Sequence, residues 1–377
     1  MLTGGGTGGH ITPILAVAHE LKRLRPDIRL VYIGERHGKF GHLLKDNPDI
    51  DAFYTIFAGK FRRYHGESVL KRLFALQDHL LNLRDAVFVL VGIIQSYRLL
   101  GKLKPDVLFQ KGGYVGMPVG LAAAARKVPF VTHDSDILPG LANRVVSRWA
   151  KFNATGMPAE YYPYPEARTR HVGVLVSKDY KEVEPSLQKQ YRIDLGLPAT
   201  AKVLFVTGGS QGSRVINLAM VQIAANLLAK HHDLHIIHQV GKGSVRVYGD
   251  YANARLQVLE FLDGMHRYSG AADMIVTRAG ANTLAEFGVQ GRACLVIPNP
   301  LLTGGHQLKN TEYLLQKDAI VAVKEKDLAK DAAALAIAIE DLLQDKAKRD
   351  ALGAKLQAIT IPDATHRLAL LLLEAAG

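Results

Sequence analysis

The chain has almost none of the residues that build disulfide-stapled or cysteine-ligated domains. Its 377 residues contain one cysteine, Cys294, which excludes an internal disulfide framework and a zinc site made of cysteines. The longest apolar run, Ala86 to Ile94, is far short of the roughly 18–20 residues that span a membrane. The chain opens directly on a glycine-rich segment, so no signal peptide is expected. We therefore expect a cytoplasmic protein of two domains, at roughly 150 residues each.

Acidic residues are scarce in the first half of the chain. Residues 1–172 hold 24 Lys+Arg against 14 Asp+Glu, whereas residues 173–377 hold 23 against 21. The overall net charge of +12 is therefore concentrated in the first half. Such an excess favours an anionic partner: nucleic acid, a membrane surface or a phosphorylated substrate. The alternative is a basic protein whose charge bias is accidental.

Short β-rich runs alternate with helical patterns along the whole chain. The predicted strands are Leu30–Ile33, Ala52–Ile56, Val107–Gln110, Phe130–Thr132, Val203–Thr207, Leu234–Gln239, Val258–Phe261, Met274–Thr277, Cys294–Ile297 and Ile320–Val323. The helical patterns include Ile14–Leu24, Gly120–Arg126, Val215–Ala229 and Leu284–Gln290. The alternation predicts an α/β fold with parallel sheets, in two similar nucleotide-binding halves that face each other across a cleft. The turn-rich stretch 161–170 is the expected boundary.

Glycines gather in loops that follow the predicted strands. The first loop, GGGTGGH (Gly4–His10), lacks the acidic residue that a dinucleotide fingerprint needs, but its amides and the following helix favour an anion. His10 lies at the first helical turn, where it can take a proton from a bound hydroxyl; capping or phosphate contact is the alternative. Only Met1, Leu2 and Thr3 precede the loop, so we expect a very short first strand or a chain start further upstream.

The second half has its own loop, GGSQGS. Ser210 and the amides of Gln211 and Gly212 predict a second anion cradle, although a tight turn between strand and helix needs the same glycines.

Two further motifs each allow a structural and a functional interpretation. In RAGANTLAE, Asn282 or Thr283 can cap a helix, and Glu286 then completes a capping box; alternatively its carboxylate accepts both hydroxyls of a ribose. In HDSD (His133–Asp136), the carboxylates can bind a metal or a sugar, and capping of the following turn is the alternative.

Seven motifs in order resemble glycosyltransferase family 28. They are GGTGGH, KGGYVGMP, HDSDILPGLANR, GGSQGS, RAGANTLAE, GGHQLKN and the tail IPDATHR, and they cover nearly the whole chain. The resemblance implies the GT-B architecture, with two Rossmann-like doubly wound domains facing a cleft. It implies an acceptor- and membrane-facing domain over 1–172 and a UDP-GlcNAc-binding domain over 173–361. A C-terminal helix, about 362–377, is expected to pack back on the first domain.

The resemblance also implies the reaction and the residues that perform it. The reaction is an inverting transfer of N-acetylglucosamine from UDP-GlcNAc to the 4-hydroxyl of a lipid-linked N-acetylmuramyl-pentapeptide in peptidoglycan synthesis, with His10 as the catalytic base. Donor contacts are implied at Thr7, Gly8, Gly9, Asp136, Ser210, Gln211, Gly212, Leu262, Ala281, Asn282, Thr283, Leu284, Ala285, Glu286 and Gln307. Acceptor or diphosphate contacts are expected at Gly112, Gly113, Tyr114, His133, Asp134 and Asn143. Membrane contacts are expected at Phe61, Arg62, Arg63, Lys71, Arg72 and Phe74, where basic and apolar residues interleave.

The expected partners follow from this reaction. They are UDP-GlcNAc, the polyprenyl-diphosphate-linked muramyl peptide, an anionic membrane surface and proteins of cell-wall synthesis, with no nucleic acid. We expect a peripheral protein on the cytoplasmic face of the cell membrane. No cofactor is expected to be required, no metal site is expected, and a dependence on a divalent metal is left open. Ser177 stands where the family commonly has an arginine that approaches the donor diphosphate, and Lys178 lies beside it.

Four other functions are compatible with parts of the pattern. A related transferase would glycosylate a diacylglycerol lipid, but the HDSD block and the IPDATHR tail favour peptidoglycan. A UDP-GlcNAc 2-epimerase shares the two-domain architecture, which is an argument from fold alone. A nicotinamide oxidoreductase is disfavoured, because the chain lacks the acidic residue that binds the cofactor ribose in the dinucleotide fingerprint. A non-catalytic UDP-sugar-binding module is allowed by the altered run Val174–Ser177.

Overall fold

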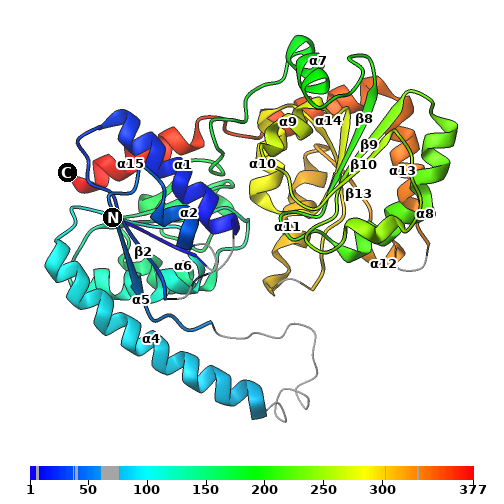
Figure 1. Cartoon of the computed structure of the whole chain (residues 1–377). Helices are drawn as coiled ribbons and strands as arrows, with labels where there is room; N and C mark the ends of the chain where they lie inside the picture. Colours follow the sequence, from blue (N-terminus) through cyan, green and yellow to red (C-terminus); the bar gives the residue numbers. More distant parts are fainter. Residues whose placement is uncertain (6–7, 37, 39–40, 61–75, 302, 329–330) are drawn as a thin grey trace. The chain divides into compact units, whose positions relative to one another are not determined.

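The structure, a computed structural model, describes residues 1–377 apart from 6–7, 37, 39–40, 61–75, 302 and 329–330. The chain forms two compact units (Figure 1). Unit 1 comprises Met1–Ser177 together with Pro362–Gly377, and unit 2 comprises Lys178–Ile361. Each unit holds one parallel sheet covered by helices, which confirms the predicted fold class.

Unit 1 is built on a seven-stranded sheet in the order β3-β2-β1-β4-β5-β6-β7. The strands are β1 (Leu2–Thr3), β2 (Val31–Glu35), β3 (Ala52–Ile56), β4 (Leu108–Gln110), β5 (Phe130–Asp134), β6 (Phe152–Thr155) and β7 (Thr169–His171). Every neighbouring pair is parallel. The two-residue strand β1 is central, because Leu2 pairs with Tyr32 on one side and with Phe109 on the other.

The helices of unit 1 enclose this sheet. They are α1 (Gly8–Leu24), α2 (Gly41–Lys45), α4 (Leu76–Leu103), α5 (Gly113–Ala125), α6 (Leu141–Val146) and α15 (Ala364–Ala376), with short 3₁₀ turns at Ser147–Trp149, Ala159–Tyr161 and Glu166–Arg168. The core on one side of the sheet joins Ile33, Leu108 and Phe130 to Val119 and Ala122 of α5. Apolar residues occur in continuous runs in these strands because both faces of the sheet are covered.

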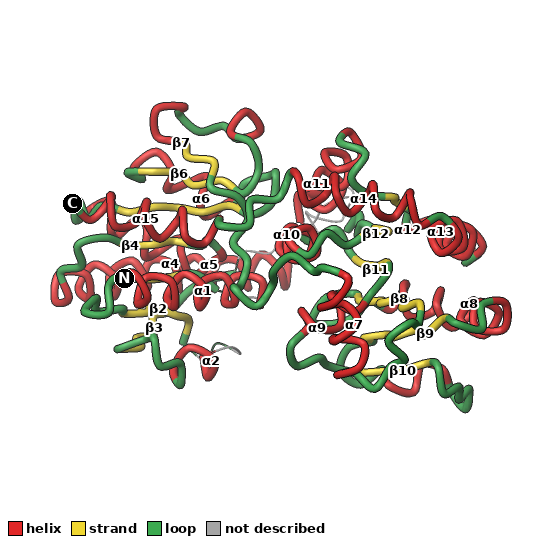
Figure 2. The backbone as a smooth tube through the Cα atoms, turned by 90° about the horizontal axis from the view of Figure 1, so that it is seen from above, coloured by secondary structure: helices red, strands yellow, loops and turns green. Residues whose placement is uncertain are grey.

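Unit 2 repeats the same topology with a six-stranded sheet, β10-β9-β8-β11-β12-β13 (Figure 2). Its strands are β8 (Lys202–Thr207), β9 (Leu234–Gln239), β10 (Leu256–Leu259), β11 (Met274–Thr277), β12 (Ala293–Val296) and β13 (Val321–Ala322). Its helices are α7 (Pro185–Asp194), α8 (Arg214–Lys230), α9 (Met265–Ala271), α10 (Ala281–Val289), α11 (His306–Gln316), α12 (Glu325–Leu328), α13 (Ala333–Gln344) and α14 (Lys346–Ala358), with 3₁₀ turns at Val245–Tyr248 and Thr303–Gly305.

Alternate residues of β8 pack on opposite faces of this sheet. Leu204 and Val206 belong to the core that includes residues of α8 and α13. Phe205 points the other way and meets Phe287 of α10 edge-on, with ring centroids 6.3 Å apart. Successive side chains of the strand thus contact helices on opposite faces of the sheet.

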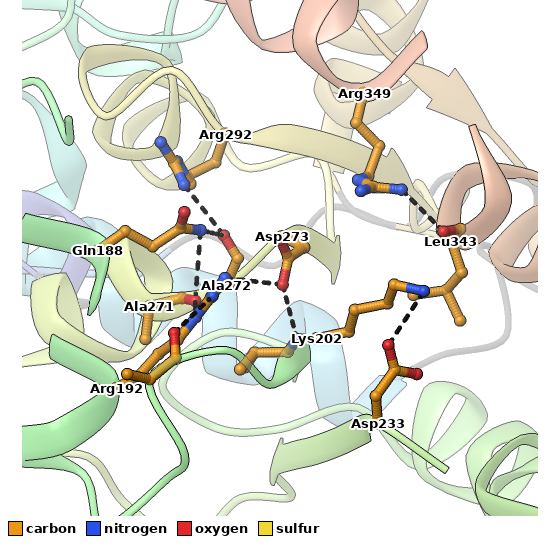
Figure 3. Close-up of polar contacts among 12 residues, drawn as sticks. Gln188, Arg192, Lys202, Asp233, Ala271, Ala272, Asp273, Arg292, Leu343 and Arg349 are labelled. Carbon is orange, nitrogen blue, oxygen red and sulfur yellow. Dashed lines mark hydrogen bonds and ion pairs between the residues drawn. The ribbon is translucent and has the colours of Figure 1, made fainter. Parts of the chain in front are cut away.

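A polar cluster fixes α7 at the start of the strands (Figure 3). Arg192 donates to the Ala271 carbonyl oxygen at 3.0 Å and pairs with Asp273 at 2.9 Å. The same Asp273 carboxylate accepts from the backbone amide of Val203, at the beginning of β8. Gln188 adds a hydrogen bond to the Ala272 carbonyl oxygen. This cluster stabilises the end of the sheet at which the strands begin, opposite their carboxyl ends.

The two units divide after Ser177, later than the expected boundaries in the stretch 161–170 and after residue 172. Residues 159–171 contain β7 and two 3₁₀ turns of unit 1, which their tyrosines and prolines did not indicate. Val174, Leu175 and Val176 are buried in the same unit. Thr365 of α15 donates to the Val176 carbonyl oxygen at 2.8 Å, and His366 donates to Glu20 of α1 at 2.6 Å. The last helix therefore packs on the first helix of unit 1.

Helix α4 has a buried stripe and, on another side, an exposed apolar stripe. The buried stripe, which packs against α5, consists of Asp85, Val89, Gly92, Ser96 and Leu100. The exposed stripe consists of Leu80, Leu83, Val87, Leu90 and Ile94, each 50–66% exposed. The segment 79–103 is long and apolar enough, by length and composition, to cross a membrane. The sequence analysis overlooked it because single polar residues divide it into short apolar runs.

Candidate functional site

Glycine loops occupy both sides of the topological switch point in unit 1. The chain order runs outward from β1 on one side and from β4 on the other, and parallel sheets bind ligands beyond the carboxyl ends of such strands. Gly4 and Gly5 follow β1, whereas Lys111, Gly112 and Gly113 follow β4. Gly113 has a φ of +76°, and a Cβ there would lie 2.0 Å from the Gly5 carbonyl oxygen. Only glycine allows the two loops to meet this closely.

His10 stands in the first turn of α1, where the sequence predicted it. Burial of the imidazole and, to a lesser extent, the nearby Lys111 ammonium lower the pKa of His10 to about 4, against the opposing effect of the Asp136 carboxylate. The residue as a whole is nevertheless partly exposed. His10 is therefore uncharged at neutral pH and able to accept a proton. Of the neighbouring donor contacts, Gly8 and Gly9 begin α1, and Thr7 lies outside the described residues.

Lys111 is a buried cation that the sequence analysis did not single out. Lys111 follows β4 directly and is 4% exposed. Its Nζ donates a hydrogen bond to Ser135 Oγ at 3.0 Å. Burial lowers the pKa of Lys111 to about 8, against the opposing influence of Asp134 and Asp136. A positive charge therefore stands beside His10 at pH 7. The one signal in the sequence was its position directly before a glycine pair at the end of a strand.

The HDSD segment is held by hydrogen bonds within unit 1. His133 donates from Nε2 to the Gly173 carbonyl oxygen at 2.9 Å and is fully buried. Asp134 accepts from the Gly140 amide at 2.9 Å and from the Tyr164 hydroxyl at 2.7 Å. Gly140 is the N-cap of α6, so Asp134 closes the turn before that helix, as the capping interpretation predicts. Asp136 differs, because it acts electrostatically on both His10 and Lys111.

The GGY loop is fastened to its neighbours in the same way. Tyr114 donates a short hydrogen bond to Glu35 at the end of β2, and burial raises its pKa. Asn143 donates to the His133 carbonyl oxygen at 3.0 Å and accepts from Gln110 at 3.1 Å. Of the six expected acceptor residues, the structure therefore gives Tyr114, His133, Asp134 and Asn143 internal partners. Gly112 and Gly113 place their backbone at the start of α5.

In unit 2, the loop 208–213 lies between β8 and α8. Ser213 is the N-cap of α8, and its Oγ accepts from the Ile216 amide. The Gly212 amide donates to the Gly209 carbonyl oxygen at 2.8 Å. Because that amide is already hydrogen-bonded within the turn, only Ser210 and Gln211 of the predicted anion-binding residues stay available to an anion. Both are exposed.

Arg278 ties this loop to two other parts of unit 2. It donates to Ser213 Oγ at 2.6 Å and to the Ile297 carbonyl oxygen at 3.0 Å, and it forms a close ion pair with Glu325 of α12. Both charged side chains are largely buried. The first residue of the RAGAN motif thus positions the loop that was predicted to bind an anion.

The capping-box interpretation of Glu286 is wrong. Helix α10 begins at Ala281 with Gly280 as its N-cap, so Thr283 is inside the helix and Glu286 lies one turn further on. The carboxyl of Glu286 is hydrogen-bonded to the hydroxyl of Tyr180, and burial raises the pKa of Glu286 to about 8. The expected donor segment Ala281–Glu286 is therefore the first part of α10, beyond the carboxyl end of β11.

The remaining expected donor residues lie on neighbouring loops of unit 2. Leu262 is buried after β10. Gln307 lies in the first turn of α11, and its amide oxygen accepts from the Asn299 amide at 2.9 Å. The expected membrane contacts Phe61, Arg62, Arg63, Lys71, Arg72 and Phe74 lie outside the described residues. Within the described ranges, no group of three His, Cys, Asp or Glu side chains is placed to hold a metal ion.

Solved structures share this two-domain fold over nearly their whole length. MurG of Acinetobacter baumannii superposes with a TM-score of 0.73 over 99% of both chains, at 24% identity. The calicheamicin glycosyltransferase CalG4 superposes with a TM-score of 0.67 at 16% identity, covering 100% of this chain and 97% of its own. An enzyme described as a UDP-N-acetylglucosamine 2-epimerase from Listeria monocytogenes has the same TM-score at 13% identity, covering 97% and 94%.

Sequence comparison defines the family. Residues 1–155 match the glycosyltransferase family 28 N-terminal domain, and residues 203–368 match the family's C-terminal domain. The chain belongs to glycosyltransferase family 28. It is 32% identical to the UDP-N-acetylglucosamine–N-acetylmuramyl-(pentapeptide) pyrophosphoryl-undecaprenol N-acetylglucosamine transferase of Salinibacter ruber, over 98% of this chain and 94% of that protein. It is 30% identical to the protein of the same name from Halalkalibacterium halodurans, over 100% and 99%.

Proposed function

We propose that the protein transfers N-acetylglucosamine from UDP-GlcNAc to the 4-hydroxyl of a lipid-linked N-acetylmuramyl-pentapeptide. The observation that carries this proposal is the full-length similarity, at 30–32% identity, to transferases named for that reaction. The geometry supports it, because each sheet carries glycine loops at its switch point, with His10 in unit 1 and Glu286 in unit 2.

The chemistry is a displacement at the anomeric carbon of the donor. His10 takes the proton of the acceptor hydroxyl while its oxygen forms the new bond, and the bond to UDP breaks with its electron pair on the diphosphate. We assign the stabilisation of that charge to the N-terminus of α8 and to the exposed loop residues Ser210 and Gln211 of unit 2. Attack opposite the leaving group inverts the anomeric configuration.

Replacing Glu286 by alanine is expected to weaken UDP binding about tenfold or more, because two charge-assisted hydrogen bonds to the ribose are lost. The structure gives Glu286 no capping role in α10, so the helix should remain folded. Calorimetric titration with UDP measures the effect, and circular dichroism verifies the helix content. An unchanged affinity would contradict the ribose assignment.

We further propose that the protein binds the cytoplasmic face of the membrane peripherally, where its lipid-linked acceptor resides. The exposed stripe of α4 supports this, because five apolar side chains are presented along one side of a helix that is anchored by its opposite side. The exposed cations Arg84, Arg98 and Lys102 lie on the same helix, and its one acidic residue over 79–103, Asp85, is buried. Apolar residues with flanking cations suit an anionic lipid surface.

Replacing Leu90 by glutamate should reduce sedimentation with anionic vesicles several-fold, because a charge then enters the apolar stripe. Ile337→Glu is the matched control, since Ile337 is a similarly exposed apolar residue on helix α13 of unit 2. Equal loss of binding in both variants, or equal binding of the parent to neutral and anionic vesicles, would contradict the proposed surface.

The decisive assay offers UDP-GlcNAc and a lipid-linked muramyl pentapeptide, with and without a divalent metal. The proposal predicts the lipid-linked disaccharide and free UDP. Formation of UDP-N-acetylmannosamine would instead identify an epimerase, and transfer to diacylglycerol would identify a glycolipid transferase. Donor binding without any product would identify a binding module.

A further inference from the structure

Tyr180 reaches the proposed ribose site from outside the seven sequence motifs. It lies between the division of the units and α7, in a segment that Arg292 fastens by donating to the Val183 carbonyl oxygen at 2.9 Å. Its ring meets His266 of α9 edge-on, with centroids 6.0 Å apart. Its hydroxyl is hydrogen-bonded to the carboxyl of Glu286 on α10. Ring and hydroxyl together hold Tyr180 against the face where α9 and α10 meet.

The residue Glu286 is partly exposed, and its carboxyl has one titratable partner, Tyr180. Burial raises the pKa of Glu286 to about 8, and the hydrogen bond from Tyr180 opposes that increase. The elements packed against α10 include α9, α14 and β12, and also β8, whose Phe205 meets Phe287. Their titratable groups are His266, Arg267, Tyr268, Lys346, Lys348, Arg349, Asp350, Lys355, Cys294 and Lys202. None of these shifts the titration of Glu286, so its protonation depends on burial and on Tyr180.

We propose that Tyr180 is a positioning residue for the donor, whose hydroxyl orients the Glu286 carboxyl toward the ribose, and that donor binding releases the carboxyl proton to solvent. The inference rests on the proposed function, because it takes a UDP-sugar as the ligand. In the free protein the carboxyl is largely protonated at pH 7. On binding, the O–H bond of the carboxyl breaks, the proton passes to water or buffer, and the carboxylate keeps the electron pair.

Hydrogen-bond capacity explains why the proton must leave. An ionised carboxylate offers about four acceptor sites and no donor. Two ribose hydroxyls and the Tyr180 hydroxyl supply three donors, which the carboxylate can satisfy together. A protonated carboxyl has its own O–H and competes with the ribose hydroxyls. The ionised form therefore binds the donor more tightly, and affinity rises with pH up to the pKa of the free group.

The test is calorimetric binding of UDP-GlcNAc to the full chain between pH 6 and 9, in buffers of different ionisation enthalpy. UDP-GlcNAc is used because its diphosphate is esterified at both ends and does not titrate in this range. For the parent we expect the Kd to fall about tenfold per pH unit below pH 7.5, with release of close to one proton. Glu286→Gln should bind weakly and without pH dependence, because an amide does not titrate.

Tyr180→Phe is the informative variant, and Tyr191→Phe is its matched control. Tyr191 meets the same His266 ring at 6.1 Å, but Glu286 does not influence its titration. Tyr180→Phe should bind UDP-GlcNAc about tenfold more weakly at pH 7.5 and move the rise in affinity to higher pH, because a hydrogen bond that favours the carboxylate is lost. Tyr191→Phe should behave as the parent does, and melting curves verify that both variants fold.

Three results separate the possible failures. A Tyr180→Phe variant with the parent's affinity and pH profile overturns the inference and leaves the proposed function standing. Weaker binding with an unmoved pH profile also overturns it, because it shows a structural role alone. A parent protein that does not bind UDP-GlcNAc at any pH overturns the proposed function itself.

Discussion

Replacing His10 by alanine should lower kcat by about 100-fold to 10,000-fold, the usual contribution of a positioned general base. The imidazole stands at the start of α1 beside the two glycine loops of unit 1, and it is uncharged at neutral pH. The measurement is steady-state transfer to the lipid-linked acceptor at saturating UDP-GlcNAc. UDP-GlcNAc affinity measured by calorimetry is the control, because donor binding should survive the change. Turnover within about threefold of the parent would exclude His10 as the base.

The same assignment has a consequence for pH. The neutral form of His10 is the base, and its pKa of about 4 keeps that form fully populated above about pH 5. At saturating substrates, kcat should therefore stay nearly constant between pH 6 and 8. At low UDP-GlcNAc, the rate should instead rise with pH, because Glu286 must ionise before the donor binds. An acidic limb in kcat near pH 6.5 would indicate a base with an unperturbed imidazole pKa.

Replacing Arg278 by alanine should destabilise unit 2 by about 3–5 kcal/mol, the usual effect of removing one partner from a buried ion pair. Glu325 would keep a largely buried charge without its partner, and Ser213 would lose the hydrogen bond that orients the loop before α8. Donor affinity should fall with stability, because that loop carries the proposed diphosphate contacts.

The single tryptophan makes this prediction selective. Trp149 belongs to unit 1, so its fluorescence follows that unit during unfolding, whereas far-ultraviolet circular dichroism follows both. Arg278→Ala should lower the unfolding midpoint seen by circular dichroism for unit 2 and leave the tryptophan midpoint unchanged. Lys230→Ala is the control, because its ion pair with Glu340 is exposed and contributes at most about 1 kcal/mol. Equal midpoints in the two variants would contradict the assigned role of Arg278.

Strands rich in apolar residues were the most predictable part of the fold. Ala52–Ile56, Leu234–Gln239 and Met274–Thr277 have the bounds that the sequence predicted. Strands β6 (FNAT) and β7 (TRH) were missed because they are short and rich in polar residues. They are stabilised by pairing with neighbouring strands rather than by the strand propensity of their own residues.

The start of α5 shows how packing overrides helix propensity. The helix begins at Gly113, seven residues before the predicted Gly120, and it contains Gly116 and Pro118. A Cβ at Gly120 would lie 2.2 Å from the Gln110 side-chain oxygen, so a larger residue there would displace the Gln110 side chain. Glycine and proline have low helix propensity, so the sequence did not predict a helix here. Glycine is nevertheless favoured where the helix packs closely against the sheet.

Loop positions in the site were predictable, but contacts between loops were not. Glycine runs after buried strands indicated the ligand end of each sheet, because the carboxyl ends of parallel strands share one edge. The contact of Ser213 with Arg278 and that of Tyr180 with Glu286 each join residues that are far apart in the sequence. Local spacing carries no information on such pairs, so Glu286 was compatible with a capping box until the first turn of α10 was known.

The return of α15 to unit 1 has a consequence for synthesis of the protein on the ribosome. Unit 2 is continuous, from Lys178 to Ile361, and all of its strands precede α15 in the chain. Unit 1 lacks a covering helix until 362–377 have left the exit tunnel, because His366 and Thr365 supply contacts to Glu20 and Val176. The N-terminal unit, although made first, is therefore the last to acquire its full set of contacts. Until then the nascent chain exposes the part of α1 that α15 contacts in the folded protein.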